Sequence, residues 1–221
     1  MEMFFLKRLS RMKEFIRTTP QCLYALFLPV FILLFFTVER LVPADADYWV
    51  SYLPLDDRIP FCAPFIVPYC LWYPYLVATG LFLLVKDRAE LTRYMLFLMV
   101  GFGFSLAFCL VFPNGQNLRP DPLPGNDLFT WLCARIYAAD TNTNVLPSMH
   151  VIGCCAGVCA AFRSREMKRL RLPSLLLALL ICASTVLVKQ HSILDIYAGL
   201  AVSAVLAVCV YLLPKVLGKK R

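Results

Sequence analysis

A histidine and an aspartate four residues apart, His191 and Asp195, are the side chains of this sequence best spaced for joint chemistry. On a helix, residues at this spacing share a face, so the carboxylate can accept a hydrogen bond from one ring nitrogen of the histidine. The other ring nitrogen is then presented as a nucleophile or a base. An ordinary first-turn aspartate that complements the helix dipole is the alternative interpretation.

The second histidine of the chain, His150, ends the run Pro147-Ser148-Met149-His150, directly before the apolar stretch Val151–Phe162. Proline is favoured in the first turn of a helix, and the free N–H groups of that turn form an anion site together with the helix dipole. A histidine there would face a docked anion. A capped membrane helix with an incidental histidine explains the same four letters.

The composition excludes an ordinary soluble domain. Of the 221 residues, 60% are hydrophobic and 16% are charged, against about 45–50% apolar residues in soluble domains. Mean hydropathy is +0.70. This predicts a polytopic membrane protein. The net charge of +8 then favours anionic lipid over nucleic acid as a partner, and no nucleic-acid binding is expected.

Long apolar runs predict an all-α fold with six transmembrane helices in one bundle, each near the ~20 residues that cross a bilayer. The runs are Gln21–Val42, Phe61–Val85, Thr92–Phe112, Val145–Phe162, Leu172–Val188 and Ser192–Leu213. Residues 1–19 mix basic and apolar side chains at helical spacing, which is typical of an amphipathic interfacial helix. A short helix outside the membrane is expected over Asp127–Asp140.

The basic residues predict the orientation of these helices. Of the 22 Lys and Arg residues, all but Arg40, Arg58, Arg119, Arg135 and Lys189 fall on the side of the N-terminus. Positively charged loops stay in the cytoplasm, so both termini are predicted to be cytoplasmic. Both histidines, Asp195 and Arg119 then fall on the outer face.

Arg119 is a candidate site residue because it is predicted to lie on the same outer face as the two histidines. A guanidinium binds phosphate through a planar fork of donors, although a solvated loop arginine is the simpler interpretation of the residue alone. In order along the chain, Arg119-Pro120, Pro147-Ser148-Met149-His150 and His191–Asp195 resemble the three motifs of the type 2 phosphatidic acid phosphatase superfamily. Residues 20–221 are then a six-helix transmembrane phosphatase-like domain.

The resemblance implies a role for each motif residue. His191 corresponds to the nucleophile that becomes a phosphohistidine, and Asp195 to its orienting partner. His150 corresponds to the general acid for the leaving alkoxide and to the base for the acceptor. Arg119 and Ser148 correspond to the phosphate cradle. The family's catalysis needs no metal or other cofactor, and the sequence contains no metal-ligand cluster.

Two cations of the family pattern are missing, because Phe112 stands where the pattern has lysine and Thr185 where it has arginine. Lys189 is the expected substitute, and Gln116 could add a neutral donor. Similar losses occur in the branch that includes inositol phosphorylceramide synthase and sphingomyelin synthase. The sequence therefore does not determine which molecule accepts the phosphoryl group. With water as the acceptor the protein is a phosphatase, and with an alcohol it is a transferase.

The expected function is hydrolysis of a lipid phosphate or diphosphate at the outer membrane face. Transfer of a phospho-head group to a lipid alcohol, with the same residues, is the second hypothesis. A non-enzymatic transporter with a His/Asp ion site is the third, but it leaves the ordered motifs unexplained. The compact loops indicate a bacterial cytoplasmic membrane, with the site facing the extracytoplasmic side.

Overall fold

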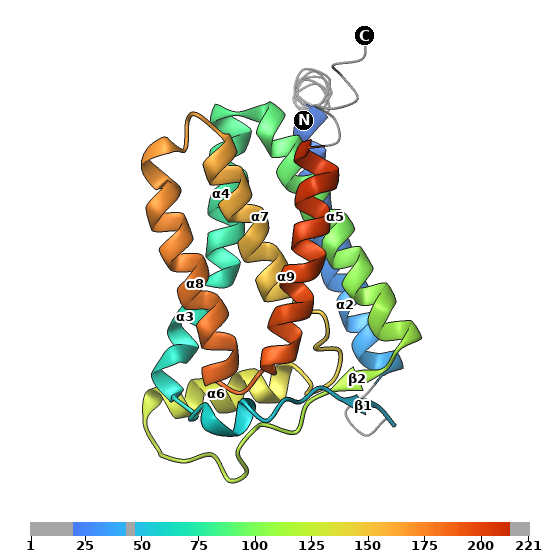
Figure 1. Cartoon of the computed structure of the whole chain (residues 1–221), viewed down its shortest axis with the longest axis vertical. Coiled ribbons are helices and arrows are strands. Elements are labelled where there is room, and N and C mark those ends of the chain that lie inside the picture. Colours follow the sequence, from blue (N-terminus) through green and yellow to red (C-terminus); the bar gives the residue numbers. More distant parts are fainter. Residues whose placement is uncertain (1–19, 43–46, 213–221) are drawn as a thin grey trace, which may run out of the picture.

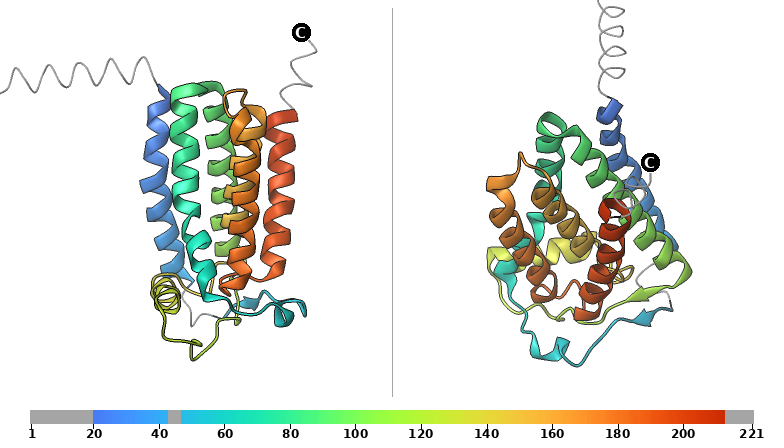
Figure 2. Two further views of the ribbon diagram at one scale, coloured as in Figure 1. Left: turned by 90° about the vertical axis from the view of Figure 1, so that its left-hand side faces the viewer. Right: turned by 45° about the horizontal axis from the view of Figure 1, so that its top comes forward.

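The computed structural model describes residues 20–42 and 47–212 of the chain. The interfacial helix expected over residues 1–19 lies outside the described residues. The described chain is mostly helical, as the apolar runs predict. Its long helices are α2 (Phe27–Leu41), α4 (Trp72–Lys86), α5 (Arg88–Val111), α7 (Met149–Arg163), α8 (Arg171–Leu187) and α9 (Ile193–Ala207). They lie side by side in one bundle (Figures 1 and 2).

Shorter helical segments extend or join these helices. They are the 3-10 turns Pro20–Leu26, Asp56–Arg58, Ala63–Phe65 and Lys168–Leu170, the helix α3 (Ile66–Cys70), and the π turn Val208–Leu212. Among the described residues, four continuous segments are long and apolar enough to cross a membrane. These are Ala63–Lys86, Arg88–Val111, Lys168–Leu187 and Ile193–Leu212. The six-span arrangement and the sides of the termini stay predictions.

α7 is shorter than the span predicted over 145–162. Asn114 Oδ1 accepts hydrogen bonds from the backbone N–H groups of Val145 and Leu146, at 3.1 and 2.8 Å. These bonds hold both residues in the preceding loop, and the helix begins only after Ser148. Its 15 residues span about 22 Å, less than the ~30 Å of a bilayer core.

One end of the bundle, here named the capped end, is covered by the short helix α6 (Leu128–Ala139) and by loops (Figure 1). The loops include β1 (Trp49–Val50), which pairs in parallel with β2 (Asn114–Gly115). α6 is the short helix expected over 127–140, and the Asp127 carboxylate caps it by accepting from the N–H groups of its first turn. α7 and α9 begin at the capped end and α8 finishes there (Figure 1).

α7 is the central helix of the bundle and packs against α4, α5, α8 and α9. Small residues permit this close packing, as is common between membrane helices. A Cβ on Gly153 would lie 2.7 Å from Trp72 Nε1, and one on Gly199 would lie 3.0 Å from the Ser148 carbonyl oxygen. These approaches bring α4 and α9 against the first two turns of α7, which carry His150.

Candidate active site

His191 and Asp195 meet through the N-terminal cap of α9. The helix begins at Ile193 with Ser192 as its N-cap, so His191 precedes the helix. Asp195 Oδ2 accepts the backbone N–H of Ser192 at 3.0 Å and lies 3.1 Å from His191 Nδ1. The expected pair is present, but its geometry is a capping box and not the expected helix face, because the chain turns before the helix starts.

The pairing selects one tautomer of His191. The carboxylate of Asp195 is fully buried, and an ionised carboxylate only accepts hydrogen bonds. His191 Nδ1 therefore carries the proton in the arrangement that satisfies this contact, and Nε2 keeps its lone pair. The fixed ring thus presents a nucleophilic nitrogen away from Asp195.

Ser51 holds the other oxygen of the same carboxylate, and the sequence gives no signal of it. Its hydroxyl donates to Asp195 Oδ1 at 2.5 Å, and the serine is fully buried. Ser51 follows β1, and its backbone N–H donates to the Gly115 carbonyl at 2.7 Å. The β1–β2 pairing therefore sets the position of a group that orients Asp195 from 144 residues away in sequence.

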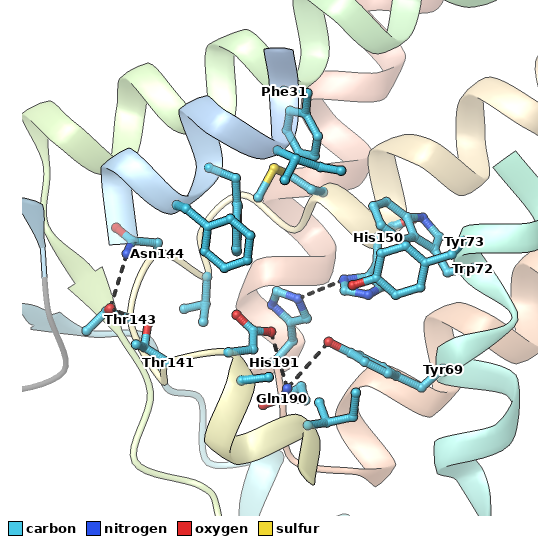
Figure 3. A pocket seen from close by; sticks show the side chains of 18 residues that line it. Phe31, Tyr69, Trp72, Tyr73, Thr141, Thr143, Asn144, His150, Gln190 and His191 are labelled. Carbon is cyan, nitrogen blue, oxygen red and sulfur yellow. Dashed lines mark hydrogen bonds between the residues drawn. The ribbon is translucent and has the colours of Figure 1, made fainter. Parts of the chain in front are cut away.

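His150 lies against the free side of His191. Its Nδ1 is 3.4 Å from His191 Nε2, and its ring packs on Tyr69 and Trp72 with centroid distances of 4.5 and 4.4 Å (Figure 3). Trp72 Nε1 also donates to the His150 carbonyl at 3.2 Å. His150 Nε2 is buried without a hydrogen-bond partner. The imidazole is thus held in place with one ring nitrogen available.

Ser148 lies at the junction of α7 and α9. Its backbone N–H donates to the Asp195 carbonyl at 3.2 Å, which ties the two helix starts together. Its hydroxyl is fully buried and has no partner. An unused donor at a helix N-terminus is suited to an anionic oxygen.

Arg119 is held by protein acceptors. Its guanidinium donates to the carbonyls of Thr141 and Tyr137, at 2.6 and 3.3 Å, and to Gln190 Oε1. It also stacks on the Tyr137 ring at 4.5 Å. Burial lowers the pKa of Arg119. In this arrangement the arginine fixes Gln190 and the 137–141 segment.

Lys189 and Gln116 hold the turn that carries His191. Lys189 has a left-handed backbone, φ 53°, and its ammonium donates to the Asp56 carbonyl at 2.9 Å. Gln116 Nε2 donates to the Lys189 carbonyl at 3.0 Å, and Gln116 Oε1 accepts the Leu118 N–H at 2.6 Å. Both side chains are occupied with the protein itself.

A cavity of about 300 Å³ opens beside the two histidines. Its apolar walls come mainly from α2, α3, α4 and α7 (Figure 3), and include Phe31, Phe35, Tyr69, Trp72, Tyr73 and Met149. Its polar wall includes Asp140, Thr141, Thr143, Asn144 and Gln190. Ser148, Arg119, Lys189 and Gln116 do not line it. Within the described residues, no three His, Cys, Asp or Glu side chains converge as metal ligands.

Glu39 supports the polar wall from α2. Its carboxylate accepts from the Thr141 backbone N–H at 3.2 Å and from Asn144 Nδ2 at 2.8 Å. The sequence does carry a signal here, since an acidic residue within an apolar span is a functional candidate. Tyr69, Trp72 and Asp140 carry no comparable signal, because aromatic residues and loop carboxylates are common in any membrane protein.

Replacing Ser51 with alanine is expected to lower kcat about tenfold with little change in KM, because Asp195 loses one of its orienting bonds and no substrate contact is removed. The unpaired buried oxygen is also expected to cost about 1–3 kcal/mol of unfolding free energy. Steady-state kinetics and denaturant unfolding measure the two effects. Ser51→Thr should restore most of the rate.

Ser105→Ala is the matched control, because Ser105 is equally buried but donates only to the Gly101 carbonyl within α5. A Ser51→Ala protein with normal kcat would remove the orienting role.

Residues 116–219 match the family model described as the PAP2 superfamily. The matched region contains Arg119, Ser148, His150, His191 and Asp195. It excludes Ser51 and the aromatic residues that hold His150. Searches of curated proteins and of solved structures found no match to the chain.

Proposed function

Because residues 116–219 of this chain belong to the PAP2 superfamily, we propose that the protein is an integral-membrane lipid phosphatase that works through a phosphohistidine on His191. The observation that carries the proposal is the series Asp195–His191–His150, with contacts of 3.1 and 3.4 Å, at the wall of a cavity lined with aromatic side chains. The substrate is a lipid phosphate or diphosphate, with the phosphate at the histidines and the lipid along the apolar wall.

In the first step, His191 Nε2 attacks phosphorus while the bond to the lipid oxygen breaks. Throughout this step, the Asp195 carboxylate accepts a hydrogen bond from His191 Nδ1–H and stabilises the positive charge that develops on the ring. An alkoxide is a poor leaving group, so protonated His150 donates its proton to the departing oxygen. General acid catalysis of this kind contributes about 10²–10⁴-fold.

In the second step, His150 takes a proton from water and the resulting hydroxide attacks the phosphohistidine. The N–P bond breaks, phosphate leaves, and both histidines return to their starting states. The unpartnered Ser148 hydroxyl and the N-terminus of α7 are the proposed donors to the phosphoryl oxygens. Arg119 would reach the phosphate only after exchanging one of its protein acceptors.

The lipid is proposed to reach the site from the bilayer, between α2 and α4. Phe31 and Phe35 of α2 and Tyr73 of α4 line the cavity, and Tyr73 is 56% exposed. Four apolar helices of membrane-spanning length support the membrane location. The distribution of Lys and Arg supports an extracytoplasmic position for the capped end, in the cytoplasmic membrane of a bacterium.

Transfer of a phospho-head group to a lipid alcohol is the second candidate, in the manner of the sphingomyelin and inositol phosphorylceramide synthases. The observation that favours it is the cavity wall, on which no Lys or Arg is found and Asp140 is the one carboxylate. Such a wall suits a phosphate monoester dianion poorly. In this reaction the acceptor alcohol would replace water in the second step.

The purified protein in detergent is expected to release phosphate from phosphatidic acid or an isoprenoid diphosphate in the presence of a metal chelator, and vanadate should inhibit it. Adding diacylglycerol or ceramide to a labelled phospholipid tests transfer in the same assay. A labelled lipid product supports the transferase, and free phosphate or a free phospho-alcohol supports the hydrolase. Turnover that survives His191→Ala would refute both.

A further inference from the structure

We infer that the cavity binds the cationic amine head group of a zwitterionic phosphodiester lipid, with Asp140 as the counter-ion and Tyr69 and Tyr73 as aromatic neighbours. The inference rests on the proposed function, because it uses the same phosphohistidine chemistry. It replaces the lipid phosphate monoester of the leading proposal with a phosphodiester whose head group carries a positive charge, which is the kind of donor that the second candidate reaction requires.

The charge on the cavity wall is the first argument. Of the side chains that line the cavity, Asp140 is the single Asp, Glu, Lys or Arg residue. Arg119 lies behind Gln190, and the Glu39 carboxylate on α2 accepts hydrogen bonds from Thr141 and Asn144 of the same wall. A monoester dianion would therefore meet negative charge. A zwitterion brings a cation for Asp140 together with a singly charged phosphate.

The surroundings of Asp140 are the second argument. Asp140 Oδ2 accepts a long hydrogen bond from Gln190 Nε2 at 3.4 Å, and a hydrogen bond with Tyr69 lowers the pKa of the carboxyl. Burial and the neighbouring Glu39 raise the pKa of Asp140 to about 6 although Arg119, His191 and Tyr69 lower it, so these neighbours do not fully offset the cost of removing the carboxylate from water. Asp140 is half-buried and forms no salt bridge with the described residues, whereas charges removed from water are normally paired. A ligand cation would supply the missing partner.

Aromatic and polar neighbours complete the site. Tyr69 and Tyr73 line the cavity and lie within electrostatic reach of Asp140. Aromatic rings attract ammonium groups through their quadrupole. Asn144 Oδ1 and His150 Nε2 belong to side chains that are less than one-tenth exposed and line the cavity, and both atoms lack a partner. The head group and the reacting phosphate can therefore occupy one cavity.

The reaction on such a diester balances without a further reagent. His191 Nε2 forms a bond to phosphorus, the bond from phosphorus to the diglyceride oxygen breaks, and His150 protonates that oxygen. His191 then carries the phosphorylated amino alcohol. Water, deprotonated by His150, displaces the histidine and releases the phosphorylated amino alcohol. An acceptor alcohol in place of water would give a new zwitterionic lipid.

The test compares four lipids with identical acyl chains in mixed micelles: phosphatidylcholine, phosphatidylethanolamine, phosphatidylglycerol and phosphatidic acid. Diglyceride release should give kcat/KM values about tenfold higher for the two cationic head groups, as an ion pair with aromatic contacts would produce. Equal rates, or a preference for phosphatidic acid or phosphatidylglycerol, would overturn the inference. If neither these four lipids nor an isoprenoid diphosphate is cleaved or labels His191, the proposed function itself fails.

Asp140→Asn keeps an acceptor for Gln190 and removes the charge. It should lower kcat/KM for phosphatidylcholine about tenfold and should not lower it for phosphatidylglycerol, because the anionic lipid gains nothing from the Asp140 charge. Asp121→Asn is the matched control, because Asp121 is an exposed carboxylate in a loop of the capped end. An equal loss of kcat/KM for phosphatidylcholine in Asp140→Asn and Asp121→Asn would contradict a direct contact between Asp140 and the head group. If Asp140→Asn does not fold, the test is inhibition of the wild-type protein by phosphocholine and by glycerol phosphate. Phosphocholine is expected to bind about tenfold more tightly, and equal inhibition constants would contradict the inference.

The head-group preference should also grow as pH rises through about 6, because Asp140 must lose its proton to pair with the amine. Around this carboxylate lie Glu39, Arg119, His191, Tyr69 and Tyr73. Burial and Glu39 raise its pKa, and Arg119, His191 and the hydrogen bond with Tyr69 lower it. The ratio of the rates for phosphatidylcholine and phosphatidylglycerol cancels titration of the shared catalytic groups. The Asp140→Asn ratio should be flat across the same range.

Discussion

Replacing His191 with alanine is expected to abolish covalent labelling of the protein by a radiolabelled lipid phosphate and to lower turnover by more than about 10³-fold, as for other lost nucleophiles. The reason is that His191 Nε2 is the atom proposed to form the bond to phosphorus. Rapid denaturation in base, followed by gel autoradiography, measures the label, because phosphohistidine is stable in base and hydrolyses in acid.

The composition of the chain limits the residues that could carry the label. The protein contains only two histidines, so a phosphohistidine lies on His191 or His150. His191→Asn is the matched control for folding, because the asparagine amide can replace Nδ1 as a donor to Asp195 and offers no nucleophilic nitrogen. It should melt like the wild type and stay unlabelled. Label that persists in His191→Asn and disappears in His150→Ala would reverse the two roles.

Replacing His150 with alanine is expected to lower turnover of a lipid alkoxide substrate by about 10²–10⁴-fold, the usual contribution of a general acid and base. The effect should depend on the leaving group. A nitrophenyl ester needs no proton on its leaving oxygen, so the variant should still release one equivalent of nitrophenol in a burst. The phosphohistidine should then accumulate, because the attack of water also needs His150.

The aromatic pocket around His150 provides the control. His150→Phe keeps a ring between Tyr69 and Trp72, which preserves the packing seen at 4.5 and 4.4 Å, but it cannot transfer a proton. It should reproduce the burst with normal thermal stability. Equal losses for alkoxide and nitrophenyl substrates would instead show that His150 acts by positioning and not by proton transfer.

Both predictions depend on a site built from two halves of the chain. His150, His191 and Asp195 come from the region that matches the family. Ser51, Tyr69 and Trp72 come from the first half, and they orient Asp195 and hold His150. The first half also supplies part of the apolar wall of the cavity through Phe31 and Phe35. Specificity is therefore expected to vary with residues outside the motifs.

The helical character and the apolar segments are predictable from the sequence, because hydropathy over about 20 residues is a local property. The start of α7 is not. The apolar run suggests a span from Val145, but Asn114 binds the backbone of Val145 and Leu146 from 31 and 32 residues away. A side-chain contact across that separation leaves no periodic pattern, so the shorter helix emerges only in the folded chain.

The residue types and order of the motifs let the sequence alone identify His191, Asp195 and His150 as one candidate centre. The opening prediction for His191 and Asp195 assumes a shared helix face, whereas the tertiary structure forms the contact through the cap of α9. It also directs Lys189 to the Asp56 carbonyl and Gln116 to the Lys189 carbonyl, and it places Arg119 behind Gln190. The residue types and their spacing along the chain identify the candidate reactive groups. Long-range packing decides which of them reach the cavity, since loops distant in sequence supply the competing acceptors.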